Sequence, residues 1–252
     1  MRGLQNGLLL NPDKTTALFT GTRQQVERGN ALGGVTLCGH HISYAPCAKL
    51  LGVKIDNCMN FREHVLSVSR SCNYHIHALR HVRHLLTQDE ANAIAVSLVN
   101  SRLDYCNGIL FGIGKGVMKQ LQSIQNSAAR VVTRASFRAS SSESLRSLHW
   151  LPVEYRIQYK LANIAYGIRS KTQPKYLQTL LHDYKPSRTL RSSSTHHFEE
   201  PRVRTELASR AFSYSAPKIW NSLPLHVKES TSCGLFKQHL KTHLYKIAFD
   251  CV

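Results

Sequence analysis

The spacing of apolar residues changes at Phe61, and this change most constrains how the chain can fold. From Phe61 to Leu86, apolar side chains recur every three or four residues, which places them in one row along a face of an α-helix. Such a helix is stable in water chiefly when its apolar face packs against other elements. The sequence therefore predicts a mainly helical fold from residue 61 onward.

A second helix is predicted directly after the first. Thr87 and Glu90 have the spacing of a capping box, with Thr87 as the N-cap. The helix is expected to run through Ile94 and Leu98 toward Leu103.

Four more helices are predicted from the same spacing, over 117–131, 153–168, 207–220 and 236–249. The run Ser140–Ser142 before Glu143 is suited to capping a short helix and offers a hinge. Trp150 and Trp220, each beside a proline-containing turn, are predicted to be core anchors.

The first 56 residues have a different pattern, of short apolar runs between turn residues. Candidate strands are Thr16–Thr20, Val35–Leu37, His41–Tyr44 and Leu50–Ile55, of which the middle two form a predicted hairpin. Gly29, Gly33 and Gly34 mark an exposed loop.

These patterns together predict an α+β fold that is predominantly α-helical. We expect a small β region over 1–56, a helical region over 57–139 and a second mainly helical region over 140–252. Each of the two helical regions is long enough to bury a core.

The charge of the chain is strongly uneven. Its 33 Lys and Arg residues against 15 Asp and Glu residues give a net charge of +18, apart from 14 His residues. Such an excess favours a polyanionic partner, although a basic and inert surface is the alternative.

The seven cysteines are odd in number and irregularly spaced, so they do not indicate a disulfide framework. We find no signal peptide and no apolar run of the roughly 18 residues that a membrane helix needs. An intracellular protein, nuclear or cytoplasmic and without a membrane partner, is the expectation.

Several motifs in order along the chain resemble the C-terminal part of reverse transcriptases of non-LTR (LINE-type, jockey-like) retrotransposons. The resemblance begins with Gly7–Thr15, Lys49–Asp56 and Asn60–Val65, which are similar to the last palm strands and the start of the thumb helix. It continues downstream of the polymerase through Leu103–Asn107, Leu121–Arg130, Leu148–Val153, Pro174–Leu177 and Ala216–Pro224.

The resemblance implies an RNA-directed DNA polymerase as the parent enzyme, which would use Mg²⁺. Nucleotidyl transfer needs paired metal-binding carboxylates, and the family carries an adjacent Asp pair on its palm. This sequence has no Asp-Asp dipeptide, and the adjacent glutamates Glu199 and Glu200 lie far from the polymerase-like segment. We therefore expect no polymerase activity and no bound cofactor. Lys14 matches the family's phosphate-side lysine, and a solvated turn residue is an equal alternative.

Two groups of Cys and His residues raise the question of zinc: Cys72 with His75, His77, His81 and His84, and Cys233 with His239, His243 and Cys251. The first group lacks a second pair of Cys or His ligands at a matching spacing. In addition, the side chains of His77, Arg80, His81 and His84 lie together opposite the apolar row. The second group has an unusual spacing for a zinc knuckle. No metal site is therefore predicted, and zinc stays the alternative.

Two stretches are candidates for binding phosphates. One is the thumb-like helix with Arg70, Arg80 and Arg83. The other contains Lys185, Arg188, Arg191, Arg202 and Arg204 among hydroxyl residues. Contacts to the phosphate backbone of a nucleic acid need positive charge and no recognition of the bases. RNA and DNA are therefore the expected partners, largely independent of sequence. The alternative is a host-adopted binding protein, or a remnant without a physiological role.

Overall fold

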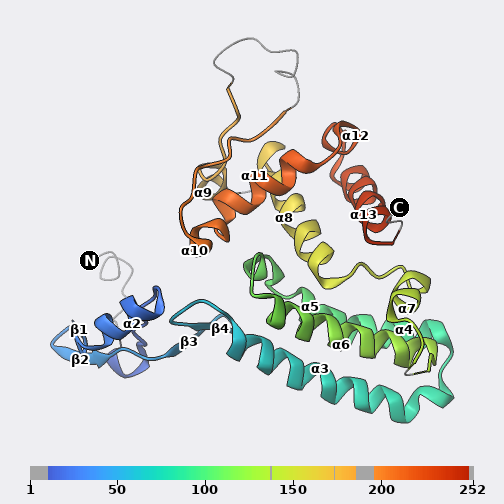
Figure 1. Cartoon of the computed structure of the whole chain (residues 1–252), viewed down its shortest axis with the longest axis horizontal. Coiled ribbons are helices and arrows are strands. Elements are labelled where there is room, and N and C mark those ends of the chain that lie inside the picture. Colours follow the sequence, from blue (N-terminus) through green and yellow to red (C-terminus); the bar gives the residue numbers. More distant parts are fainter. Residues whose placement is uncertain (1–10, 137, 173, 186–195, 250–252) are drawn as a thin grey trace. The chain divides into compact units, whose positions relative to one another are not determined.

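The computed structural model describes residues 11–136, 138–172, 174–185 and 196–249. The fold is α+β and mainly α-helical, as predicted: two small antiparallel sheets near the N-terminus are followed by helices (Figure 1). The chain divides into two compact units, Met1–Ser67 and Val68–Val252. The predicted division near residue 140, inside the second unit, stays a prediction.

The first unit contains two β-hairpins. β1 (Gly34–Leu37) pairs with β2 (His40–Ser43), which confirms the predicted hairpin. β3 (Cys47–Leu50) pairs with β4 (Val53–Asp56), where one strand over Leu50–Ile55 was expected. That expectation was wrong because Leu51 and Gly52 both have positive φ, of 46° and 84°, and so form the tight turn of a two-residue hairpin.

A helix, α2 (Arg23–Asn30), lies where turns and a loop were expected. Thr22 caps it: its side chain accepts from the Gln25 backbone, and the Gln25 side chain accepts from the Thr22 backbone. Gly29 belongs to this helix and is buried, so it is not part of an exposed loop. The predicted strand Thr16–Thr20 is also wrong, because Ala17 forms an isolated bridge there. A 3₁₀ turn, η1 (Pro12–Lys14), precedes it.

The buried carboxylate of Asp56 shapes the start of the long helix α3 (Arg62–Val82). Its Oδ1 accepts hydrogen bonds from the backbone N–H groups of Cys58 (3.2 Å) and Asn60 (3.0 Å), and its Oδ2 accepts from that of Phe61 (2.6 Å). A negative charge beside the first turn of a helix is favourable, because the unpaired N–H groups point toward it. The predicted long helix is confirmed.

In the second unit, α3 is followed by the 3₁₀ turn η2 (Arg83–Leu85) and by α4 (Gln88–Ala95). The predicted capping box is confirmed: Glu90 accepts from the Thr87 N–H at 2.8 Å, and Thr87 Oγ1 accepts from the Glu90 N–H at 3.3 Å. A π-helical segment, Val96–Asn100, then joins α4 to α5 (Ser101–Asp104).

The π segment controls which residues of this helix are buried. The buried residues follow one another at intervals of four: Ala91, Ala95, Val99 and Leu103. In a regular α-helix, four residues exceed one turn of 3.6, so such a row would drift around the helix. The wider π turn removes part of the drift, and Leu98 points outward with 37% of its surface exposed.

The remaining predicted helices are present, with one interruption. They are α6 (Lys115–Thr133), α7 (Ser141–Ser147), α8 (Val153–Arg169), α10 (Glu206–Ser209), α11 (Phe212–Ser222) and α13 (Cys233–Phe249). The helix expected over 207–220 is split into α10 and α11. Short turns of helix are η4 (Asn107–Leu110), α9 (Lys175–Gln178) and α12 (Leu225–Lys228).

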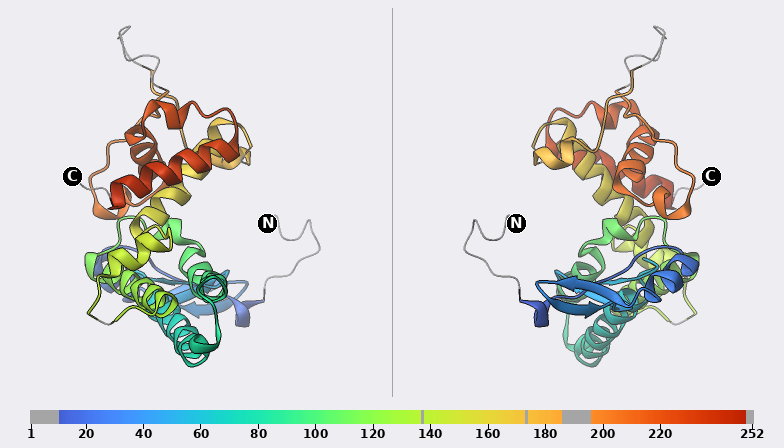
Figure 2. Two further views of the ribbon diagram at one scale, coloured as in Figure 1. Left: turned by 90° about the vertical axis from the view of Figure 1, so that its right-hand side faces the viewer. Right: turned by 90° about the vertical axis from the view of Figure 1, so that its left-hand side faces the viewer.

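α8 is the centre of the C-terminal helices, and both α11 and α13 pack against it (Figure 2). Trp220 and Phe236 are completely buried between them, and the Tyr166 ring stacks on Phe236 with 4.2 Å between centroids. Both tryptophans are core residues, as predicted. Within the described ranges, no helix has the length and apolar character needed to cross a membrane.

Candidate nucleic-acid interface

One face of α3 is polar, exposed and rich in basic residues. Cys72, Ile76 and Leu79 are buried on the opposite face. The exposed face carries Arg70, Asn73, Tyr74, His77, Arg80 and His81, followed by His84 in η2. Tyr74 has 72% of its surface exposed. The face that the sequence predicted as hydrophilic is therefore open to a partner.

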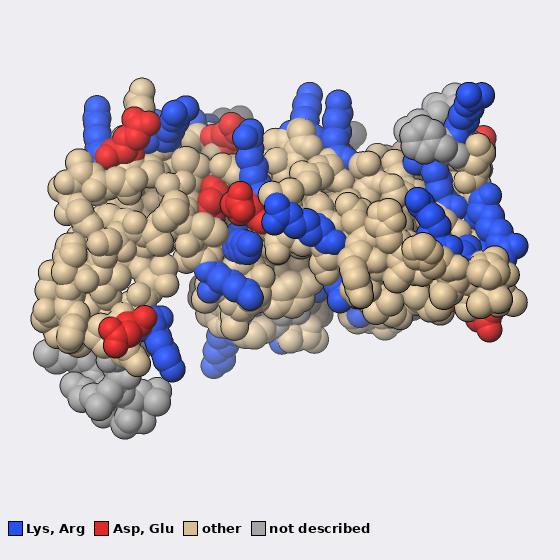
Figure 3. Space-filling model, turned by 90° about the horizontal axis from the view of Figure 1, so that it is seen from below, with Lys and Arg blue, Asp and Glu red and all other residues tan. Residues whose placement is uncertain are grey.

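An open groove of about 600 Å³ adjoins the C-terminal end of this face. α3 and η2 contribute Arg80, Arg83 and His84, while the end of α6 contributes Arg130 and Arg134. Figure 3 shows Lys and Arg side chains gathered over these two helix ends, at the right of the view. The structure thus brings four arginines from two distant segments to one place.

Arg83 differs from its neighbours because it is buried, contrary to the exposed arginine that the sequence analysis expected. Its Nη2 donates to the Val132 carbonyl (2.6 Å), its Nε to the Val131 and Val132 carbonyls (both 3.1 Å) and its Nη1 to the Leu86 carbonyl (2.7 Å). Burial, together with the charge of Arg134, lowers the pKa of Arg83. Arg83 therefore holds the groove together and has few donors left for a phosphate.

Arg70 and Arg80 are the exposed arginines of the predicted thumb-like helix. Neither has a carboxylate partner within the part of the chain that the structure describes. They lie ten residues apart, which is about 15 Å along the helix axis. A duplex or a strand lying along α3 can reach both.

The second predicted basic stretch is described in part. Lys185, Arg202 and Arg204 are exposed, while Arg188 and Arg191 lie outside the described residues. An isolated antiparallel β-bridge joins Asp183 to Phe198. None of the three described residues lines the groove at the end of α3. They form a separate candidate surface.

The predicted metal and catalytic candidates are dispersed. Cys72 is buried, its thiol donates to the Val99 carbonyl (3.9 Å), and burial raises its pKa to about 11. Cys251 is outside the described residues, and His239 Nδ1 lies 3.1 Å from Ser230 Oγ. No three His, Cys, Asp or Glu side chains converge within the described ranges. Lys14 ends the 3₁₀ turn η1 and is exposed.

Sequence reasoning did not single out Arg130 and Arg134 as site residues. They are four residues apart at the end of α6, so their spacing alone indicates a shared helix face. What the sequence does not show is that this face meets the end of α3.

No family model, no curated protein and no solved structure matches this chain.

Proposed function

We propose that this chain binds the sugar–phosphate backbone of RNA and DNA through the exposed face of α3, with little dependence on sequence. The observation that carries the proposal is the continuity of Arg70, Tyr74 and Arg80 with the arginine-lined groove. Arginine forms strong, charge-assisted hydrogen bonds to phosphate oxygens. An exposed tyrosine between two arginines adds a ring on which a base can stack.

The sequence resemblance supports the same proposal. In a non-LTR reverse transcriptase, the thumb helix follows the backbone of the template and primer. We propose that the chain corresponds to the last palm strands, the thumb and the downstream helices of such an enzyme, acting in the nucleus or cytoplasm. Because it has no adjacent Asp pair, primer extension on an RNA template with Mg²⁺ or Mn²⁺ is expected to give no product. Template-dependent extension that Lys14→Ala abolishes would contradict this.

The binding proposal is tested by removing two charges from α3. Arg70→Ala/Arg80→Ala is compared with Lys237→Ala/Lys246→Ala, which removes two exposed charges from α13. Binding of labelled single-stranded RNA and of DNA of equal length is measured by fluorescence anisotropy over a salt series. Each lost phosphate contact reduces the slope of log affinity against log salt by about 0.7 to 0.9.

The α3 variant is therefore expected to bind all sequences more weakly and with a slope lower by about 1.4 to 1.8. The α13 variant has the same net charge and is expected to keep most of the wild-type slope. Equal changes in both variants would mean that only the total charge matters. Absence of wild-type binding at low salt would refute the proposal.

A further inference from the structure

A second site lies away from the basic face of α3, in a cavity of about 510 Å³ within the Val68–Val252 unit. Its walls come from the π segment and α5, the turn at 148–151, and the helices α8 and α13. This volume is within the range of sites that hold small organic ligands.

Two asparagines give this cavity an unsatisfied polar floor. Asn100 and Asn107 both line it, and they are 1% and 2% exposed. The Oδ1 atom of each is buried and has no hydrogen-bond partner among the described residues. A buried carbonyl oxygen without a partner is unfavourable. A ligand that brings N–H or O–H donors to this floor would remove that penalty.

The cavity also carries uncompensated positive charge. Lys160 on α8 and Lys241 on α13 line it and are exposed, without carboxylate partners within the described ranges. Asp104 is already neutralised by Arg156, whose Nε donates to Oδ1 at 2.7 Å and whose Nη2 donates to Oδ2. The two lysines are therefore free to bind an anionic group.

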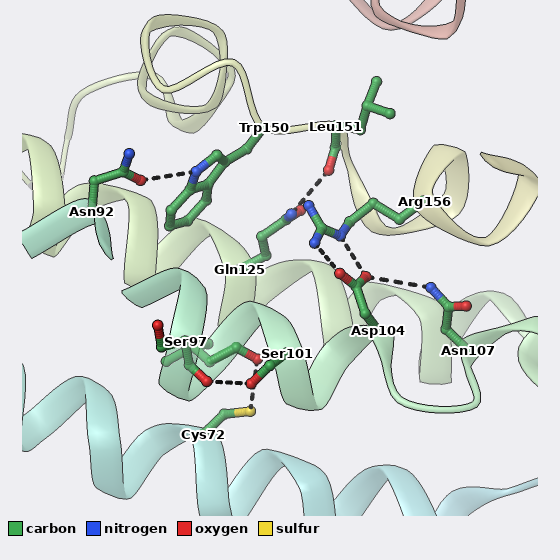
Figure 4. A network of polar contacts seen from close by, with 11 residues as sticks. Cys72, Asn92, Ser97, Ser101, Asp104, Asn107, Gln125, Trp150, Leu151 and Arg156 are labelled. Carbon is green, nitrogen blue, oxygen red and sulfur yellow. Dashed lines mark hydrogen bonds and ion pairs between the residues drawn. The ribbon is translucent and has the colours of Figure 1, made fainter. Parts of the chain in front are cut away.

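The part of the cavity wall formed by Trp150 and Leu151 is held in place by hydrogen bonds (Figure 4). Trp150, which lines the cavity, donates from Nε1 to Asn92 Oδ1 at 3.1 Å. Gln125 is fully buried and donates from Nε2 to the Leu151 carbonyl at 2.9 Å. An aromatic wall fixed in this way reduces the ordering that a ligand must impose on binding.

We infer that this cavity binds a nucleotide. The base lies beside Trp150, its exocyclic amino group donates to Asn100 Oδ1, and its phosphate lies between Lys160 and Lys241. A free nucleoside monophosphate and the terminal nucleotide of a single strand present the same chemistry. None of these residues belongs to the α3 face, so the inference does not depend on the proposed function.

The test is calorimetric titration of the full chain with AMP, CMP and, as a base-free control, ribose 5-phosphate. The wild type is expected to bind AMP or CMP about tenfold more tightly than ribose 5-phosphate, because only the nucleotides donate to the floor. Asn100→Leu is expected to remove this tenfold preference. Its melting temperature should not decrease, because the substitution removes an unpaired buried polar atom.

Lys160→Ala/Lys241→Ala gives a second, surface-only variant that leaves the core intact. This variant is expected to bind both the nucleotides and ribose 5-phosphate about tenfold more weakly than the wild type. Lys237→Ala/Lys246→Ala is expected to bind them like the wild type. Arg70→Ala/Arg80→Ala should also bind AMP like the wild type, which separates this inference from the backbone-binding proposal. Displacement of AMP by a 5′-phosphorylated oligonucleotide, and not by its unphosphorylated form, would identify a strand end as the natural source.

The inference is overturned if the folded wild type binds neither AMP nor CMP at millimolar concentration. It is also overturned if ribose 5-phosphate binds as tightly as the nucleotides, or if folded Asn100→Leu keeps the wild-type preference.

Discussion

Arg83 and Arg134 each bind the backbone carbonyls at the end of the other's helical segment. The Arg83 guanidinium receives its acceptors from Val131 and Val132 at the end of α6. Arg134 Nη2 donates to the Arg83 carbonyl at 2.9 Å and to the His84 carbonyl at 3.3 Å. A positive charge is favourable where unpaired carbonyls end a helix, so two like charges are held close together beside the groove.

Replacing Arg83 is therefore expected to reduce stability. Arg83→Met keeps much of the apolar stem but leaves buried carbonyls without donors, which should lower the free energy of unfolding by about 2 to 3 kcal/mol. Arg80→Met, on the exposed face of α3, should change it by no more than about 0.5 kcal/mol. Urea denaturation followed by circular dichroism measures both. Similar losses in the two variants would show that the carbonyl contacts of Arg83 do not matter.

His64 should make the first unit sensitive to acid. Burial, followed by the charge of Lys54, lowers the pKa of His64 from its usual 6.5, and His64 lies in the first turn of α3, where positive charge is unfavourable. Because the folded-state pKa is below the unfolded one, the unfolded state binds more protons between the two values. The stabilisation is therefore present above about pH 6.5 and is lost as pH decreases.

An NMR titration of the His64 ring should give a pKa below 6.5. Lys54→Met should raise it, whereas Lys49→Met, in the facing strand, should change it less. In His64→Gln, the first unit should resist proteolysis equally at neutral and mildly acidic pH. A His64 pKa at or above the usual value would contradict the prediction.

Gly29→Ala should loosen α2. A Cβ atom at this position would lie 2.4 Å from the Phe19 ring, and overpacking of this kind destabilises by about 1 to 3 kcal/mol. We expect trypsin to cleave after Arg23 and Arg28 faster than in the wild type, and cleavage within 1–56 to precede that of the helices after Phe61. Gly116→Ala, where an added Cβ meets nothing within 4 Å, is the control. Unchanged cleavage in Gly29→Ala would mean that Phe19 moves aside.

Tyr74→Leu should weaken single-stranded RNA binding by about 1 kcal/mol, because the ring stacks on an unpaired base. The salt slope should stay at the wild-type value, since no charge is removed. Tyr176→Leu, with a similarly exposed ring at 69%, is the control and should bind normally. If duplex and single-stranded binding decrease equally, Tyr74 does not act by stacking.

The helices were predictable because their signals are local. The row from Phe61 to Leu86 and the Thr87–Glu90 capping box depend on residues within one or two turns of each other, and both are present. α2 was missed because it contains little apolar side-chain surface, with Val26 as its buried apolar residue. The second hairpin was missed because Leu51 adopts a positive φ that its side chain does not favour.

The candidate sites were harder to predict because they depend on contacts between distant segments. The sequence identified Arg70 and Arg80, and both are exposed on one face of α3. It did not reveal that Arg83 turns inward toward Val132, 49 residues away. The unpaired Asn100 and Asn107 side chains were not predicted to form a site. Asn100 faces the core because the wide π turn, which the sequence does not reveal, changes the direction in which this residue points.

The π segment also gives this chain one place where its length can vary. A deletion of one residue between Val96 and Asn100 would convert the wide turn to a regular one, and the helix after it would keep nearly its present orientation relative to α4, because a π turn accommodates its extra residue within that turn. Leu103 would stay in the core and Asp104 would stay beside Arg156. The same deletion in a regular helix such as α6 would rotate every residue after it by about 100°, so a relative with one residue fewer can lose it between Ala95 and Ser101 and keep the same core and pocket residues.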